Sequence, residues 1–117
     1  MSELRNVRGI EMPSFPLVER ITFKPLLGAR LNVNVVTLEG GAESPVHSHE
    51  EEQLGYIVKG ACEFTDGSST WVLEPGDCYH AEPHVPHGAR ALGEGCVIID
   101  AFAPPRAGVA DLLRAQP

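Results

Sequence analysis

Helical periodicity is almost absent from this chain, and this absence restricts its fold more than any other feature of the sequence. Short runs rich in Val, Ile, Thr and aromatic residues recur between clusters of Gly, Pro and Asp. We interpret residues 18–23, 30–38, 53–58, 61–65, 70–73, 78–81, 88–91 and 97–102 as strands. The connections between them are too short for crossover helices, so the sequence predicts an all-β domain with antiparallel pairing.

Turn and tail signals agree with a meander of strands. Asp66-Gly67 offers the positive-φ residues of a tight hairpin, and Pro75-Gly76-Asp77 marks the next bend. Only residues 108–116 have the pattern of a helical turn or two. A chain of 117 residues, 43% of them hydrophobic, can bury the core of one domain. We therefore expect a single domain over residues 1–117, with an N-terminal arm (1–30), core motifs (41–91) and a C-terminal tail (103–117).

The predicted strand at 53–58 has apolar side chains on both faces. One face carries Gln53, Gly55 and Ile57, and the other carries Leu54, Tyr56 and Val58. A strand of this kind is covered on both sides. The interior of a barrel would cover one face, and a second sheet or the same surface of a second copy would cover the other. The second possibility predicts a homodimer.

Charge and hydropathy exclude several classes of partner. The chain has 9 Lys and Arg against 16 Asp and Glu, a net charge of −7 that repels nucleic-acid phosphates and acidic membrane surfaces. No run approaches the roughly 20 apolar residues of a membrane span, and the N-terminus lacks a signal-peptide run. We therefore expect a cytoplasmic protein without nucleic-acid or membrane partners. Cys62, Cys78 and Cys96 have no CxxC spacing, and we interpret them as free, buried, apolar residues.

Two stretches carry spaced polar residues. The first, Gly41-Ala-Glu-Ser-Pro-Val-His47-Ser-His49, is followed by Gln53, which precedes Gly60 by seven positions. The second is Leu73-Glu-Pro75-Gly76-Asp77, followed by Val85-Pro86-His87-Gly88. Together they resemble the two motifs of the cupins, and the resemblance covers roughly residues 41–91. It implies a double-stranded β-helix, or jelly-roll, barrel.

The resemblance also implies a metal site, with His47, His49, Gln53 and His87 as ligands. Alternate residues of a strand point the same way, so both histidines of an HxH pair can enter a barrel. Three imidazoles and one oxygen suit one divalent transition metal, such as Zn, Ni, Fe, Mn or Co. Gln53 replaces the glutamate that is commoner in cupins, and its neutral oxygen should leave the ion a stronger Lewis acid.

The polar residues next to these ligands receive other interpretations. Glu50, Glu51 and Glu52 fall in the bend before the strand, and we interpret them as solvated. His84 lies in a Pro-rich loop at the expected barrel mouth and is also predicted to be solvated. His80, on the strand at 78–81, either lines the pocket or packs outward. We include it with Gly55 and Ile57 among the candidate pocket residues.

The last strand ends in a second set of polar residues. Asp100-Ala-Phe102-Ala-Pro104-Pro-Arg106 resembles the tail of small pectin-degradation cupins, which convert unsaturated uronates from the cyclic to the linear keto form. The resemblance implies that Asp100 transfers a proton, that Phe102 forms a pocket wall and that Arg106 binds the substrate carboxylate. The alternative is that Asp100 pairs with Arg106 or caps a loop.

Gly55 departs from that family, because some members carry a polar residue at this position facing the substrate. A missing hydrogen bond there would indicate another substrate. The glycine either enlarges the cavity or marks a bulge or a close approach of strands.

We hypothesise a metal-dependent isomerase that opens the ring of a small acidic sugar such as an unsaturated uronate. The same barrel and ligand set would also serve an Fe-dependent dioxygenase, or a cupin that binds a sugar or another small molecule without catalysis. The partner expected in each case is a small, anionic molecule. Residues before His47 show no helix-turn-helix pattern.

Overall fold

The computed structural model describes residues 4–116. Its elements are η1 (Gly9–Glu11), β1 (Phe15–Val18), β2 (Ile21–Leu27), β3 (Asn32–Glu39), β4 (Glu43–His47), β5 (Glu52–Thr65), β6 (Thr70–Leu73), β7 (Cys78–Ala81), β8 (His87–Ala103) and α1 (Val109–Arg114). All strand pairs are antiparallel. The predicted all-β class and the short C-terminal helix are confirmed.

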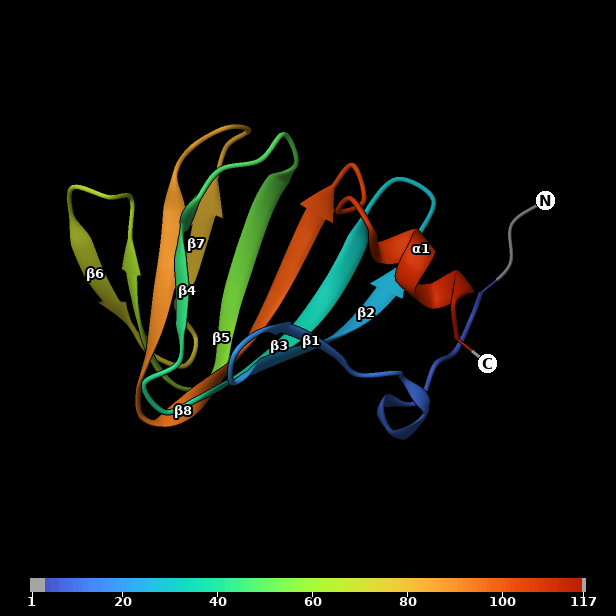
Figure 1. The fold of residues 1–117 in the computed structure, drawn as a ribbon, viewed down its shortest axis with the longest axis horizontal. Coiled ribbons are helices and arrows are strands. Elements are labelled where there is room, and N and C mark those ends of the chain that lie inside the picture. Colours follow the sequence, from blue (N-terminus) through green and yellow to red (C-terminus); the bar gives the residue numbers. More distant parts are fainter. Residues whose placement is uncertain (1–3, 117) are drawn as a thin grey trace.

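The strands form one sheet in the order β1-β2-β3-β8-β5-β6, and β4 joins β8 while β7 joins β5. The two long strands divide their pairing along their length. The first half of β5 pairs with β7 and the second half with β6. The first half of β8 pairs with β4 and the second half with β3. Figure 1 shows these strands running through the middle of the molecule, where they connect the two ends of the jelly roll.

A bulge allows β5 and β8 to bend together. Their register shifts between Ile57 and Lys59 and again between Gly60 and Cys62. Gly60 has φ 74°, and a Cβ atom there would lie 2.0 Å from the carbonyl oxygen of Gly95. Both the positive φ and this close approach require glycine. The predicted strands at 53–58 and 61–65 are therefore one continuous strand, β5, which passes through the bulge.

Other strand limits differ for local reasons. The strand predicted at 18–23 contains the turn between β1 and β2, where Arg20 has φ 66° and its carbonyl accepts a hydrogen bond from the Glu39 amide at 3.0 Å. The strands predicted at 88–91 and 97–102 are parts of β8, whereas those at 70–73 and 78–81 coincide with β6 and β7. The region described as an N-terminal arm contains β1 and β2, which belong to the sheet.

An apolar core lies on the inner face of the curved sheet. Its members include Ile21, Phe23, Val36, Leu38, Ile57, Cys62, Phe64, Cys96 and Ile98. All three cysteines are free, but Cys78 is exposed, so its predicted burial is wrong. Cys78 pairs with Tyr56 on β5, and both side chains lie on the outer face of the sheet.

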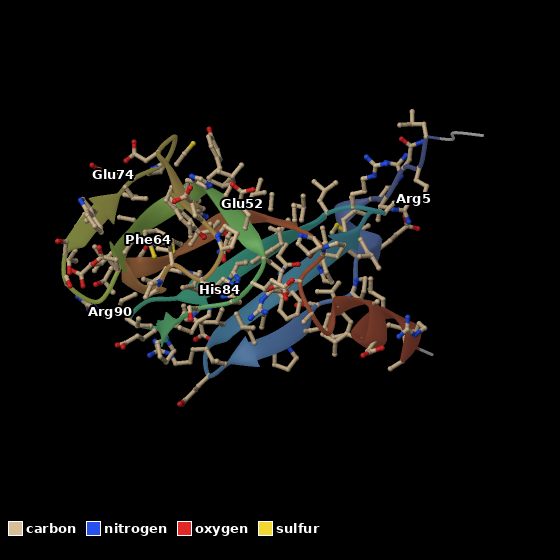
Figure 2. The ribbon with its side chains drawn as sticks, turned by 90° about the horizontal axis from the view of Figure 1, so that it is seen from above. Arg5, Glu52, Phe64, Glu74, His84 and Arg90 are labelled. Atoms are coloured by element: carbon tan, nitrogen blue, oxygen red, sulfur yellow. The ribbon has the colours of Figure 1, made fainter. Side chains whose placement is uncertain are left out.

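The molecule measures 45 × 28 × 25 Å. Figure 2 shows Arg5 at one end of the long axis and Glu74 and Arg90 at the other, where β6 is the edge strand of the sheet. Helix α1 lies beside β2, near the N-terminal end of the chain (Figure 1). Among residues 4–116, no helix has the length and apolar character needed to cross a membrane.

Candidate functional site

Three histidines meet at the junction of β4 and β8. His47 is the last residue of β4 and pairs directly with His87, the first residue of β8. Their ring centroids are 4.5 Å apart, and His49 lies 4.8 Å from His87. One ligand nitrogen from each of the three rings falls within 4.8 Å of the others. The three histidines are therefore positioned for a metal ion.

His49 is positioned by a loop hydrogen bond and not, as predicted, by alternation along a strand. It lies two residues beyond the end of β4, so strand alternation does not orient it. Its carbonyl instead accepts a hydrogen bond from the amide of His84 at 2.8 Å. His84 is exposed, as predicted, and has φ 68°, so the turn at His84 holds the chain around His49.

Backbone carbonyls determine which ring nitrogen of each histidine is free. The Nδ1 atoms lie within hydrogen-bond distance of three carbonyls, those of Pro45 (2.9 Å from His47), Glu51 (2.9 Å from His49) and Val85 (2.8 Å from His87). A neutral imidazole that donates from Nδ1 keeps a lone pair on Nε2. The three Nε2 lone pairs are thus directed toward the centre of the cluster.

The environment of His87 and Gln53 fits a cation at that centre. Nε2 of His87 is buried and has no hydrogen-bond partner among the described residues. Burial, together with the neighbouring His47 and His49, lowers the pKa of His87 and favours its neutral form. Oε1 of Gln53 lies 3.0 Å from Nε2 of His49, and two acceptors that face each other need a cation or a proton between them. Three imidazoles and an amide oxygen suit a divalent transition metal.

A chain of hydrogen bonds leads from Gln53 to Asp100. Nε2 of Gln53 donates to the hydroxyl of Tyr79 at 2.6 Å, and that hydroxyl donates to Oδ1 of Asp100. Asp100 is buried, and burial raises its pKa to about 6, although hydrogen bonds from Tyr79 and Gln53 oppose the change. Burial and the charge of Asp100 raise the pKa of Tyr79, which keeps its proton as a donor.

Tyr79 was not among the residues singled out from the sequence. The signal that could have found it is the pairing of β7 with β5, which sets Tyr79 opposite Gly55 and on the same face as Gln53. Neither strand shows this register by itself.

Arg106 pairs with Glu51 and not with Asp100. Its Nη1 lies 3.4 Å from both carboxylate oxygens of Glu51, which also accepts the Ala107 amide at 2.7 Å. The interpretation of Glu51 as solvated is therefore wrong, because only 6% of this residue is exposed. Burial by itself would raise the pKa of Glu51, but the Ala107 amide and the Arg106 guanidinium outweigh it and lower the pKa.

We expect Glu51→Gln to loosen the C-terminal tail. The amide keeps the shape but loses the charged partner of Arg106, so the free energy of unfolding should fall by about 1–2 kcal/mol. Urea unfolding measures this loss, and trypsin should cut after Arg106 faster than in the wild type. The control is Glu50→Gln, a change at an exposed neighbour. Equal stability and equal cleavage in the two variants would contradict a fastening role for Glu51.

One cavity of about 510 Å³ brings these groups together. Its polar lining includes His47, His49, Gln53, Tyr79, His87, Asp100 and Arg106, and the remainder of the wall comes mainly from β1, β2, β3 and α1. Phe102 also lines the cavity, and its ring centroid lies 5.9 Å from that of His49.

Three residues predicted to line the pocket do not do so. Ile57 is fully buried in the core. His80 points outward, where its Nε2 lies 2.6 Å from Oε2 of Glu52. Gly55 does not enlarge the cavity, because a Cβ atom there would lie 1.9 Å from Cε1 of Tyr79. The ring of Tyr79 fills that space, so Gly55 marks a close approach of strands.

Comparison with known proteins agrees with this architecture. Residues 34–102 match the family model of the cupin domain. The chain belongs to the cupin family. A pectin degradation protein, KdgF from Dickeya dadantii, is 37% identical over 68 residues, which cover 57% of this chain and 62% of that protein. The match to this curated cupin thus spans less than two-thirds of its length.

Solved cupin structures extend the likeness over more of the chain. KdgF from Halomonas sp. has a TM-score of 0.79 and 32% identity, covering 86% of this chain and 93% of its own. An RmlC-like cupin from Shewanella frigidimarina has a TM-score of 0.82 and 27% identity, covering 90% and 95%. The resemblance to small cupins of pectin degradation is confirmed.

Proposed function

We propose that this cupin is a metal-dependent isomerase that opens the ring of a small acidic sugar such as an unsaturated uronate. The observation that carries the proposal is the buried carboxyl of Asp100, which shares one cavity with the histidine cluster and Arg106. The likeness to the pectin degradation protein KdgF of Dickeya dadantii and to KdgF of Halomonas sp. supports the class of substrate.

The reaction is an isomerisation and needs no co-reactant. In a cyclic unsaturated uronate, the ring oxygen joins the anomeric carbon to a vinyl carbon that bears the carboxylate. Opening breaks the bond between the anomeric carbon and the ring oxygen. The anomeric hydroxyl loses its proton and becomes an aldehyde, and the ring oxygen becomes an enol. A proton added to the adjacent vinyl carbon, with loss of the enol proton, then gives the linear ketone.

Different residues of the cavity would bind the metal and transfer the proton. His47, His49, Gln53 and His87 would hold the metal, which supplies Lewis-acid chemistry when bound. Asp100 accepts the proton of the anomeric hydroxyl and returns a proton to the vinyl carbon.

Arg106 and Phe102 orient the substrate around this proton transfer. Arg106 contacts Glu51 through Nη1, so the opposite edge of its guanidinium can bind the substrate carboxylate. Phe102 forms a wall that excludes water from the enol.

The test is conversion of an unsaturated uronate by protein loaded separately with Zn, Ni, Mn, Co or Fe. Proton NMR follows the loss of the vinyl proton and the appearance of the linear product. Rates equal to those without protein, for every metal, would contradict the proposal. Oxygen uptake by the Fe form would support a dioxygenase instead, and binding without conversion would support a non-catalytic cupin.

We also propose that two copies pair through the outer face of the sheet. Leu54 and Tyr56 are 54% and 47% exposed there, beside Ile99 on β8 at 37%. Tyr56 has the uncharged residues Cys78 and Ile99 as its strand partners, so two chains of net charge −7 can meet there without like charges facing each other. A two-fold contact would bring the same exposed apolar residues of the two copies together.

We expect the wild type to run as a dimer in size-exclusion chromatography with light scattering, and Leu54→Lys to run as a monomer. Two buried lysines facing each other would have no partners. Val72→Lys, at an equally exposed valine on β6, should stay dimeric. A monomeric wild type would show that this face is free in solution.

A further inference from the structure

Tyr79 occupies the space that a side chain at position 55 would take. The two residues are direct partners in the β5–β7 register. A Cβ atom at Gly55 would lie 1.9 Å from Cε1 and 2.5 Å from Cζ of the tyrosine ring. On its other side the ring packs against Phe64, with centroids 4.5 Å apart. The ring therefore has one position, and its hydroxyl is carried into the cavity.

The hydroxyl of Tyr79 lies between a hydrogen-bond donor, the amide of Gln53, and an acceptor, the carboxylate of Asp100. Nε2 of Gln53 donates to the phenolic oxygen at 2.6 Å, and the phenolic hydrogen is donated to Asp100. In its ionised form Asp100 can only accept, so it sets the direction of both bonds. This direction requires the NH2 group of Gln53 to face Tyr79.

The bond to Tyr79 also fixes the position of the amide oxygen of Gln53. With NH2 held by Tyr79, Oε1 of Gln53 faces Nε2 of His49 at 3.0 Å. If the amide turned over, NH2 would face the histidine lone pairs and would displace a cation from the centre of the cluster. The hydroxyl of Tyr79 thus selects the orientation in which Gln53 offers an oxygen.

We propose that Tyr79 is a positioning residue that holds Gln53 as an oxygen ligand and restrains Asp100, from the space that Gly55 leaves free. This rests on the proposed metal site of the same cavity. A large residue from β7 supplies the hydroxyl, and the glycine on β5 provides the room for it. Groups that orient metal ligands in this way commonly change metal affinity by about 10–100-fold when they are removed.

The alternative is that Tyr79 only fills space beside Phe64. Tyr79→Phe separates the two roles, because it keeps the ring and removes the hydroxyl. The matched control is Tyr56→Phe, the same change on the outer face of β5, where the side chain is 47% exposed.

The experiment is a titration of metal-free protein with Co²⁺ in competition with a chromophoric chelator. We expect Tyr79→Phe to bind about 10–100-fold more weakly than the wild type and to change the visible Co²⁺ spectrum. Tyr56→Phe should match the wild type. In a Gln53→Ala background, Tyr79→Phe should have almost no further effect, since it acts through Gln53. Affinity within twofold of the wild type, or an equal loss in both backgrounds, would overturn the proposal.

A rescue variant tests the exchange between positions 55 and 79. Tyr79→Ala should weaken Co²⁺ binding, and addition of Gly55→Gln should recover at least about tenfold, because the vacated space admits an amide within reach of Gln53. Absence of recovery in a folded double variant would overturn the idea that the two positions substitute for each other.

The titration also separates this inference from the proposed function. A wild type that binds no Co²⁺ would contradict both the proposed function and the role of Tyr79. A wild type that binds Co²⁺ as tightly as Tyr79→Phe would contradict only the role of Tyr79. Failure to convert a uronate leaves the Co²⁺ titration unchanged and would affect the substrate alone.

Discussion

Asp100→Asn should lower the turnover of an unsaturated uronate by about 10²–10⁴-fold and leave the metal bound, because asparagine keeps the shape of the side chain but cannot exchange a proton. Proton NMR gives the turnover rate, and elemental analysis of the same sample gives the metal content. Asp100 is 8% exposed, so bulk water cannot easily take over its role.

The control for this experiment is Asp77→Asn, at an exposed turn outside the cavity, which should keep normal turnover. Turnover equal to that of the wild type in Asp100→Asn would exclude this residue as the proton carrier. Loss of the metal in Asp100→Asn would instead mean that the carboxyl acts mainly through Tyr79 and Gln53.

His49→Ala should lose a stoichiometric metal that the wild type retains on purification. The variant removes one of the three histidine nitrogens that converge on the site. Loss of a residue that only orients a ligand lowers metal affinity by up to about 100-fold, and loss of a ligand should lower it by more. The matched control is His80→Ala, since His80 lies on the outer face with Glu52. Elemental analysis should find metal in the wild type and in His80→Ala but not in His49→Ala, and equal metal in all three proteins would contradict the prediction.

The identity of the metal has its own consequence. Iron would favour the dioxygenase, whereas zinc, nickel or manganese would favour isomerisation by a Lewis acid. If neither the wild type nor His49→Ala holds metal after reloading, the histidines do not form a metal site, and a binding protein becomes the better description.

The sequence predicted best where the deciding signals are local. The strands at 70–73 and 78–81 were placed correctly because Asp66-Gly67 and Pro75-Gly76 punctuate them, and the turn at Asp66 is closed by bonds to its own neighbours. The three histidines were grouped by motif spacing, and the structure brings them together.

The prediction was wrong where a long-range partner decides what a side chain does. The sequence predicts Glu51 to be one of three solvated glutamates. In the structure it is buried and accepts a hydrogen bond from the amide of Ala107, 56 residues away. His80 and Tyr79 are neighbours on one strand, and only the pairing of β7 with β5 decides that Tyr79 faces the cavity and His80 faces outward.

Turn residues, alternation and ligand spacing are properties of short segments, so the all-β class, the cupin motifs and the set of histidines can be predicted from the sequence. Which charges pair, which face of each strand is buried and what fills the space beside Gly55 depend on contacts between segments that are distant in the sequence. A one-residue change of register moves every side chain of a strand to the other face, and register arises only when strands distant in the sequence meet.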